Sequence, residues 1–325
     1  MLQVLVTHYN EPKEIVKRFL DSLGTQTDTE FSVLFCSDGG DIEMGLDDFS
    51  GYPFEITYAY APHSGLCHTR NILLDKSTSK YVMFCDVDDE FTALGGLRAL
   101  LDKAEETGAD VVGSPYIEEA NDPKKNVILK RDTLRIHGKI FKRDYLVKNI
   151  IRFPDDEKLC DLGFIWLALS LTNKICWIDK CFYTWKFNKE SITRKDKFFK
   201  YSTYARTLYT HMALLEELKL RKRRDLYDKL LASLFGMVYV NLTNPIVITV
   251  PTNIIESAKV YAKELTLKYL NDYRRIKESL RYKCYKTEID YERVDDLAGS
   301  FVDMIPWFER LLSDNIHIIS GYKES

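Results

Sequence analysis

The first 110 residues alternate short apolar runs with segments of helical periodicity, and no other feature of this 325-residue sequence constrains the fold as strongly. The predicted strands cover residues 2–7, 31–36, 55–60, 81–85 and 109–113, and the predicted helices cover residues 11–23, 66–74 and 94–107. Strands that alternate with helices are typical of βαβ units, whose parallel strands are buried on both faces. The sequence therefore predicts an α/β fold with a mainly parallel central sheet.

Polar residues follow three of these predicted strands. They occupy residues 7–10 (THYN), 37–40 (SDGG) and 86–89 (DVDD). The carboxyl ends of parallel strands meet at one edge of the sheet, and ligands of open α/β folds bind at that edge. We therefore expect a binding site there.

The most acidic of these segments contains Asp86, Asp88 and Asp89. Three carboxylates within four residues repel one another, and a divalent cation or a cationic group offsets this repulsion. One or two of them would bind Mg²⁺ or Mn²⁺, which leaves the other coordination positions to water and phosphate oxygens. A solvated acidic turn that caps the next helix is the alternative interpretation.

Two further polar segments lie at predicted helix starts. Gly65 precedes Arg70 and Asn71, and backbone N–H groups at a helix start favour phosphate, as does an arginine. Asp161 opens an apolar helix predicted over residues 162–171, where it acts either in the chemistry or only as an N-cap.

Residues 115–193 show a mixed pattern with a strand-like run over residues 174–186. His137 and Lys139 could approach phosphates or an acceptor, although a lone histidine is more often structural. Trp185 could stack on a sugar ring and Lys186 lies beside it, but a tryptophan packed in the core is equally consistent with the pattern.

The chain changes character after Arg194. Residues 195–286 contain 19 Lys+Arg against 9 Asp+Glu, with helical periodicity and many tyrosines, whereas the last 39 residues contain 3 and 9. A solvated helix face is the simplest interpretation of the basic stretch. The alternatives are an anionic acceptor such as nucleic acid, an anionic membrane surface that holds a lipid-linked acceptor, or a homodimer interface. The net charge of −3 excludes a globally basic nucleic-acid binder.

The seven cysteines form no C-x-x-C pair, so we expect reduced thiols and a cytoplasmic protein. Residues 230–255 carry no charged side chain, and this uncharged stretch is long enough to span a membrane. Because this stretch contains Pro245 and Pro251 together with asparagines, we predict a buried helix followed by an extended segment and no transmembrane span.

The ordered motifs over roughly residues 1–194 resemble the family-2 inverting glycosyltransferases with the GT-A fold. The motifs are Thr-x-Tyr-Asn-Glu at residues 7–11, Ser-Asp-Gly-Gly at 37–40, Gly-x4-Arg-Asn at 65–71, Asp-x-Asp-Asp at 86–89, His-Gly-Lys-Ile-Phe-Lys-Arg at 137–143, Arg-Phe-Pro-Asp at 152–155, an Asp that opens a helix at 161, and Phe-Tyr-x-Trp-Lys at 182–186. The resemblance implies a Rossmann-like GT-A catalytic domain over residues 1–194, followed by a mostly helical domain over residues 195–325.

The same resemblance implies a role for each matching residue. Thr7, Tyr9, Asn10 and Glu11 would line the nucleoside pocket, Asp38 would contact the base, and Arg70 and Asn71 would face the diphosphate. In the acidic turn, Asp86 would lie near the ribose and the metal, Asp88 would ligate the metal, and Asp89 would support the turn or the donor sugar. His137, Lys139 and Lys186 would lie near the donor, and Asp161 would be the catalytic base. Two positions depart from the family pattern. Cys160 replaces the first residue of a Glu-Asp pair, which removes the supporting carboxylate but leaves the base in place. Gln3 stands in a strand position that is usually apolar, which indicates an edge strand or a polar contact there.

The implied reaction is a metal-assisted, inverting transfer of a sugar from a nucleotide-diphosphate donor, a UDP-sugar by resemblance, to an acceptor hydroxyl. Such a transfer needs charge stabilisation on the leaving diphosphate and a base for the acceptor proton. The acceptor classes left open are a glycan, a lipid-linked glycan and a hydroxylated nucleobase in DNA. A nucleotidyltransferase and a non-catalytic nucleotide-sugar binding module are the rival functions.

Overall fold

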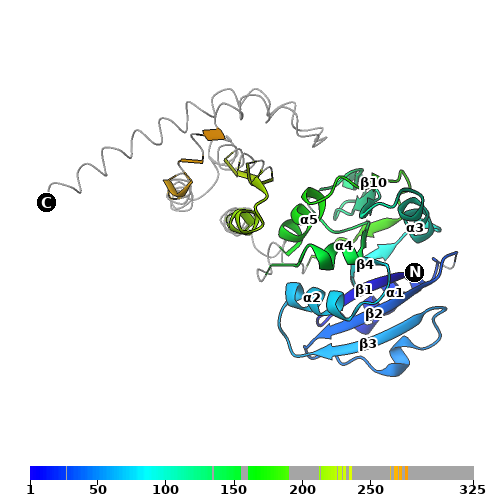
Figure 1. Cartoon of the computed structure of the whole chain (residues 1–325). Helices are drawn as coiled ribbons and strands as arrows, with labels where there is room; N and C mark the ends of the chain where they lie inside the picture. Colours follow the sequence, from blue (N-terminus) through cyan, green and yellow to red (C-terminus); the bar gives the residue numbers. More distant parts are fainter. Residues whose placement is uncertain are drawn as a thin grey trace. The chain divides into compact units, whose positions relative to one another are not determined.

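The protein is described from a computed structural model that defines residues 1–26, 28–133, 135–154 and 160–189, with further residues between 212 and 235 and between 264 and 276. The chain divides into two compact units, Met1–Asp196 and Lys197–Ser325. The first unit is an α/β structure built on a twisted central sheet (Figure 1).

A seven-stranded sheet with the order β10-β6-β9-β4-β1-β2-β3 forms the centre of the first unit. Its strands are β1 (Leu2–His8), β2 (Phe31–Asp38), β3 (Glu55–Ala61), β4 (Tyr81–Asp86), β6 (Val111–Gly113), β9 (Lys139–Lys142) and β10 (Ile175–Trp177). Strands β1 to β4 are parallel, and β9 runs antiparallel to both β4 and β6. Every residue of β1 is buried, as its central position requires. The predicted mainly parallel sheet is confirmed.

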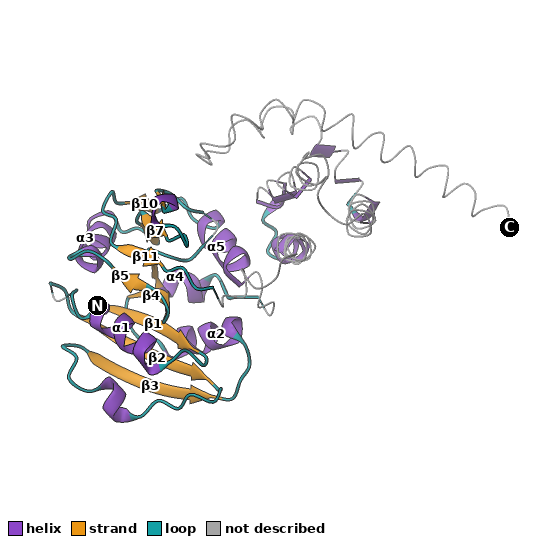
Figure 2. Ribbon diagram, turned by 180° about the vertical axis from the view of Figure 1, so that it is seen from behind, coloured by secondary structure: helices purple, strands orange, loops and turns teal. Residues whose placement is uncertain are grey.

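Five α-helices of the first unit flank this sheet. They are α1 (Lys13–Leu23), α2 (Leu66–Lys76), α3 (Gly96–Thr107), α4 (Arg143–Lys148) and α5 (Cys160–Ser170), with short 3₁₀ helices η1 (Leu46–Phe49) and η2 (Pro123–Lys125). The connections through α1 and α2 cross the sheet in opposite directions (Figures 1 and 2). Because such crossovers are right-handed, the two helices cover opposite faces of the sheet.

A second, four-stranded sheet with the order β5-β11-β7-β8 lies beside the acidic turn. Its strands are β5 (Glu90–Phe91), β7 (Tyr116–Glu118), β8 (Val127–Leu129) and β11 (Tyr183–Trp185); three of them are labelled in Figure 2. The strand-like run predicted over residues 174–186 is therefore wrong as one element. Residues 178–182 carry the chain from β10 in one sheet to β11 in the other, and Phe182 packs directly over Gly96 on the way.

Gln3 has a structural explanation. Its side chain is buried in β1, and its Oε1 accepts hydrogen bonds from the backbone N–H groups of Thr78 (2.8 Å) and Ser79 (3.2 Å). The loop before β4 has no strand partner for these groups, so the glutamine supplies one. The polar contact that we expected at this departure from the family pattern is present, although β1 is central and not an edge strand.

The expectation of reduced cysteines holds only in part. Cys36, Cys85, Cys176 and Cys181 are free thiols, whereas Cys67 is disulfide-bonded, with a partner outside the described side chains. Cysteine spacing does not reveal a disulfide between distant segments, so the cysteine pattern did not predict this bond.

The described residues of the second unit are mostly helical, as predicted. Part of its basic surface is paired internally. The Arg275 guanidinium donates to both carboxylate oxygens of Asp228 at 2.7 Å, and the Tyr227 hydroxyl donates to Asp272 at 2.7 Å. Most of residues 230–255 and all of residues 277–325 lie outside the described part. No helix among the described residues is long and apolar enough to cross a bilayer.

We expect Gln3→Leu to destabilise the protein by about 1–2 kcal/mol, because the buried N–H of Ser79 then loses its acceptor. Thermal unfolding of both proteins measures this effect. Asn121→Leu, at an exposed loop position, is the control and should leave Tm unchanged. An unchanged Tm in Gln3→Leu would contradict the role given to this side chain.

Candidate functional site

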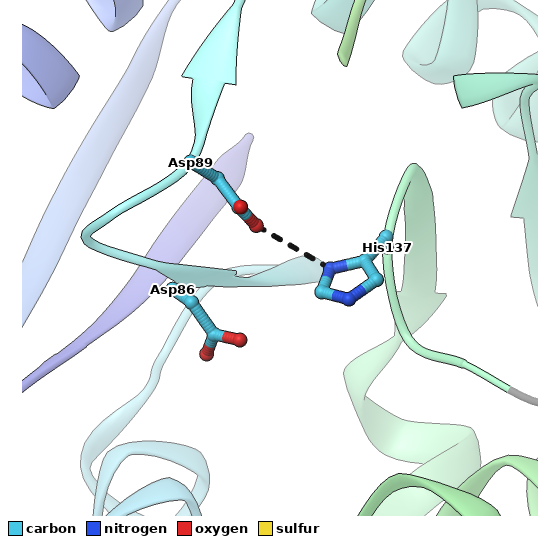
Figure 3. A group of neighbouring side chains, drawn as sticks. All are labelled: Asp86, Asp89 and His137. Carbon is cyan, nitrogen blue, oxygen red and sulfur yellow. Dashed lines mark ion pairs between the residues drawn. The ribbon is translucent and has the colours of Figure 1, made fainter. Parts of the chain in front are cut away.

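The carboxyl edge of the central sheet brings the predicted polar segments together. Thr7 lies opposite Asp86 across the β1–β4 pair, and Asp38 ends the neighbouring strand β2. After β4 the chain turns sharply, with the N–H of Asp89 donating to the carbonyl of Asp86 at 3.2 Å. Both side chains thereby remain at the same edge, as drawn in Figure 3.

Arg70 connects two carboxylates that are far apart in the sequence. Its side chain is 2% exposed, and its guanidinium donates to Asp86 Oδ1 at 2.6 Å and to Asp161 Oδ1 at 2.6 Å. Burial opposes ionisation of Asp86, but the charge of Arg70 prevails and lowers the pKa of this carboxyl. The pairing joins α2, the end of β4 and the first turn of α5 in one site.

The side chain of Asp161 is less buried than that of Arg70. It is 24% exposed, and Oδ2 lies 3.4 Å from the backbone N–H of Ile136. One oxygen is therefore held by Arg70, the other accepts a long hydrogen bond from the N–H of Ile136, and about a quarter of the side chain is exposed.

Asp89 is fully buried beneath this edge. It accepts hydrogen bonds from the Tyr183 hydroxyl (2.6 Å) and the Lys186 backbone N–H (3.1 Å), and its Oδ2 lies 3.5 Å from His137 Nδ1 (Figure 3). Burial, together with the charge of Asp88, raises the pKa of Asp89 well above its usual value. Asp89 thus anchors the strand β11 and the histidine to the acidic turn.

Among the described residues, Asp86, Asp89 and His137 form a group that fits a metal ion. One ligand atom from each lies within 4.8 Å of the other two, and the buried Nδ1 of His137 has no hydrogen-bond partner. Two carboxylates with an imidazole suit a cation such as Mn²⁺. The sequence predicts Asp88 as a ligand, and this residue lies outside the group.

Asp88 is instead held beside the group by two contacts. Its Oδ2 accepts a hydrogen bond from Asn188 at 2.9 Å, and its backbone carbonyl accepts one from Arg18 at 2.5 Å. Burial and the nearby charge of Asp86 raise the pKa of Asp88. A cation in contact with Asp88 would reverse that effect, so its role as a ligand stays a prediction.

The predicted nucleoside-pocket residues shape the loops at the other end of the edge. Asn10 adopts a left-handed backbone (φ 62°), and its Oδ1 accepts hydrogen bonds from Asp41 N (2.5 Å) and Ile42 N (3.2 Å). Tyr9 is 45% exposed and stacks on His63 at a centroid distance of 4.3 Å. Tyr9 thus offers an exposed aromatic face beside the carboxyl edge.

Asp38, predicted to contact the base, is almost completely buried. Its carboxylate accepts hydrogen bonds from Ser64 N (2.8 Å) and Gly65 N (2.9 Å), and it also lies 3.1 Å from His63 Nδ1. It therefore fixes the loop that leads into α2. Contact with a base stays a prediction.

Three other predicted ligand contacts have protein partners. Asn71 exchanges two 3.0 Å hydrogen bonds with the backbone of Phe153. Lys139 is buried and donates to the carbonyls of Arg135 (2.7 Å) and His137 (3.1 Å), and burial lowers the pKa of its amine to about 8.

Lys186 is the third of these predicted contacts. Its Nζ donates to Glu119 at 2.7 Å and lies 3.4 Å from Glu90. Together with Asn71 and Lys139, it holds segments around the site in place.

Sequence reasoning missed four residues that support the site. Arg18 and Asn188 contact Asp88, Arg135 contacts Trp185, and Tyr183 contacts Asp89. Trp185 itself stacks on His137 at 5.3 Å between centroids. The Phe-Tyr-x-Trp-Lys motif contained the signal for Tyr183, whereas no local pattern marked Arg18.

Glu11 provides a pH test of the site. Its Oε2 accepts a 2.6 Å hydrogen bond from Tyr9 N, and burial raises its pKa from 4.5 to about 7. The wild-type protein therefore loses stability as the pH rises from about 4.5 to about 7, because only the unfolded state ionises freely there. Glu11→Gln removes this loss.

We accordingly expect the stability advantage of Glu11→Gln over wild type to grow by about 2–3 kcal/mol between pH 5 and pH 8. Thermal unfolding in the presence of a chelator measures it. Glu14→Gln, on the exposed face of α1, is the matched control and should show no such growth. An advantage of equal size at both pH values would contradict the raised pKa.

Comparison with known proteins agrees with this geometry. Residues 3–157 match the model of "Glycosyl transferase family 2". The chain is 26% identical over 260 residues to the GalNAc(5)-diNAcBac-PP-undecaprenol beta-1,3-glucosyltransferase of Campylobacter jejuni. The alignment covers 73% of this chain and 81% of that protein. It is 20% identical over 219 residues to the uncharacterized glycosyltransferase EpsJ of Bacillus subtilis, of which it spans 63%.

Solved structures share the fold. TarS 1-349 of S. aureus is 19% identical, with a TM-score of 0.60 over 81% of this chain and 80% of that one. The mannosyltransferase PcManGT of Pyrobaculum calidifontis, in complex with GDP-Man and Mn²⁺, is 15% identical with a TM-score of 0.52 over 88% and 82%. These likenesses confirm the expected GT-A architecture, and residues 3–157 of this chain form a family-2 glycosyltransferase domain.

Proposed function

We propose that this chain is an inverting glycosyltransferase that moves a sugar from a UDP-sugar to an acceptor hydroxyl, with Asp161 as the base. The observation that carries the proposal is the Arg70 bridge, which holds Asp161 and the acidic edge of the sheet in one site. A site that only binds a nucleotide sugar has no need of a carboxylate held in this way on the far side of the acidic turn.

The donor half of the site is the carboxyl edge with its acidic turn. TarS 1-349 has been solved in complex with UDP-GlcNAc, and PcManGT with GDP-Man and Mn²⁺. By analogy, Asp86, Asp89 and His137, with Asp88 beside them, would hold a divalent cation here. When bound, that cation stabilises the negative charge of the departing nucleoside diphosphate.

The acceptor half of the site contains Asp161. Its Oδ2 takes the proton of the acceptor hydroxyl while the acceptor oxygen bonds to the anomeric carbon. The bond from the anomeric carbon to the diphosphate oxygen breaks, and its electron pair leaves with UDP. Arg70 keeps Asp161 Oδ1 fixed throughout, so the carboxylate orientation is set before the acceptor arrives. Attack from the face opposite the leaving group inverts the anomeric centre.

Among the acceptor classes left open by the sequence, a lipid-linked glycan has the best support. The C. jejuni relative is named for an acceptor attached to undecaprenyl diphosphate.

A thermal-shift screen of nucleotide sugars with and without Mn²⁺ tests the donor site. We expect a UDP-sugar with Mn²⁺ to stabilise the protein by about 2.7 kcal/mol at 100 times its dissociation constant, and release of UDP to accompany slow hydrolysis. Asp88→Ala should weaken the metal-dependent part of this stabilisation, whereas Asp144→Ala, at an exposed position in α4, should retain it. No response to any nucleotide sugar, or release of pyrophosphate, would contradict the proposal.

The role of Asp161 is tested by Asp161→Asn, which keeps an oxygen for Arg70 but removes the base. We expect kcat to fall by about 10²–10⁴-fold while donor-induced stabilisation persists. Asp102→Asn, an exposed carboxylate of α3, is the control and should transfer sugar at the wild-type rate. Wild-type transfer by Asp161→Asn would exclude this residue as the base.

A further inference from the structure

The antiparallel pair β7–β8 ends in an exposed apolar strand. Val127 and Ile128 are 50% and 58% exposed, although the next residue of β8, Leu129, packs against the core. Ile128 lies opposite Ile117 of β7, which is itself only partly buried. Because β8 is the last strand of its sheet, one side of its backbone has no strand partner in the described part of the chain either. Adjacent exposed aliphatic side chains on an edge strand mark an interaction surface.

Four cations flank this apolar strand. Lys124 and Lys125 precede it and Lys130 and Arg131 follow it, all with exposed side chains. None of the four takes part in an ion pair with a described residue, whereas exposed cations elsewhere in the first unit, such as Lys17, pair with carboxylates. A local charge of +4 within eight residues therefore surrounds Val127 and Ile128.

We propose that the hairpin tip, residues 124–131, docks on the surface of an anionic lipid bilayer. Aliphatic side chains between lysines and arginines match such a surface, since the apolar groups enter the headgroup boundary and the cations attract acidic lipids. Nucleic acid is a poorer fit, because the tip contains no aromatic side chain on which a base could stack.

The base of the hairpin is joined directly to the candidate site. Glu118, which ends β7, lies 3.8 Å from Arg135, and Arg135 packs over Trp185. The next residue, Glu119, accepts hydrogen bonds from Lys186 Nζ (2.7 Å) and from the N–H of Phe187 (2.8 Å). A hairpin held on a bilayer would therefore hold the site near that surface. The advantage of this placement for a lipid-linked acceptor rests on the proposed function, whereas the docking of the hairpin tip does not.

Vesicle co-sedimentation of the full chain without donor or metal tests the docking. We expect binding to vesicles of phosphatidylcholine with phosphatidylglycerol, little binding to phosphatidylcholine alone, and weakening by salt. Lys124→Gln/Lys125→Gln should weaken binding by about 25-fold, at about fivefold per cation. Arg98→Gln/Lys103→Gln changes the net charge equally on α3 and should bind like wild type.

The apolar contribution is tested separately by Val127→Thr/Ile128→Thr, which keeps β-branched residues in the strand. We expect about tenfold weaker vesicle binding with unchanged Tm, and wild-type binding by Leu94→Thr, whose side chain is 68% exposed elsewhere. Absence of vesicle binding, or equal binding by both hairpin variants and wild type, would overturn the proposal. Because no donor is present, this outcome is independent of the nucleotide-sugar screen.

Discussion

The buried guanidinium of Arg70 is the interaction on which the arrangement of the site depends. It belongs to α2, yet it bonds Asp86 at the end of β4 and Asp161 at the start of α5. The side chain of Arg70 is 2% exposed, whereas those of Asp86 and Asp161 are 26% and 24% exposed, so the guanidinium is the group that would be costly at this depth without its partners. The three elements are therefore stable in this arrangement only together. This requirement places the proposed base opposite the acidic turn before any ligand arrives.

The acidic turn is crowded, and its three carboxylates differ in their surroundings. Asp86 has the charge of Arg70 beside it, which lowers its pKa, whereas burial outweighs the contacts of Asp88 and Asp89 and raises their pKa values. Hydrogen bonds from Tyr183 and Asn188 do not offset this repulsion fully. Because the fold tolerates this repulsion among carboxylates at one edge of the sheet, a bound cation is the favoured counter-charge.

Much of the large sheet could be predicted, because buried parallel strands such as β1 and β4 read as unbroken apolar runs. The small sheet could not, since β5, β7 and β8 have two or three residues each and are too short to show a period. The motifs indicated which residues gather at the carboxyl edge. They did not show that Arg70 reaches a carboxylate 91 positions away, because a long-range pair leaves no local pattern.

The two sheets contribute differently to the site, and this division explains why its parts differ in predictability. The large sheet supplies Asp86 from the end of a long strand, whereas the small sheet and its neighbouring loop supply Tyr183, Trp185 and His137 through mutual stacking. Glu119 then ties this aromatic group to the hairpin by accepting hydrogen bonds from the segment after β11. A displacement of the hairpin would be transmitted to His137 over a few contacts, because packed aromatic rings resist independent movement. The hairpin and the site should therefore respond to a bound surface as one rigid element.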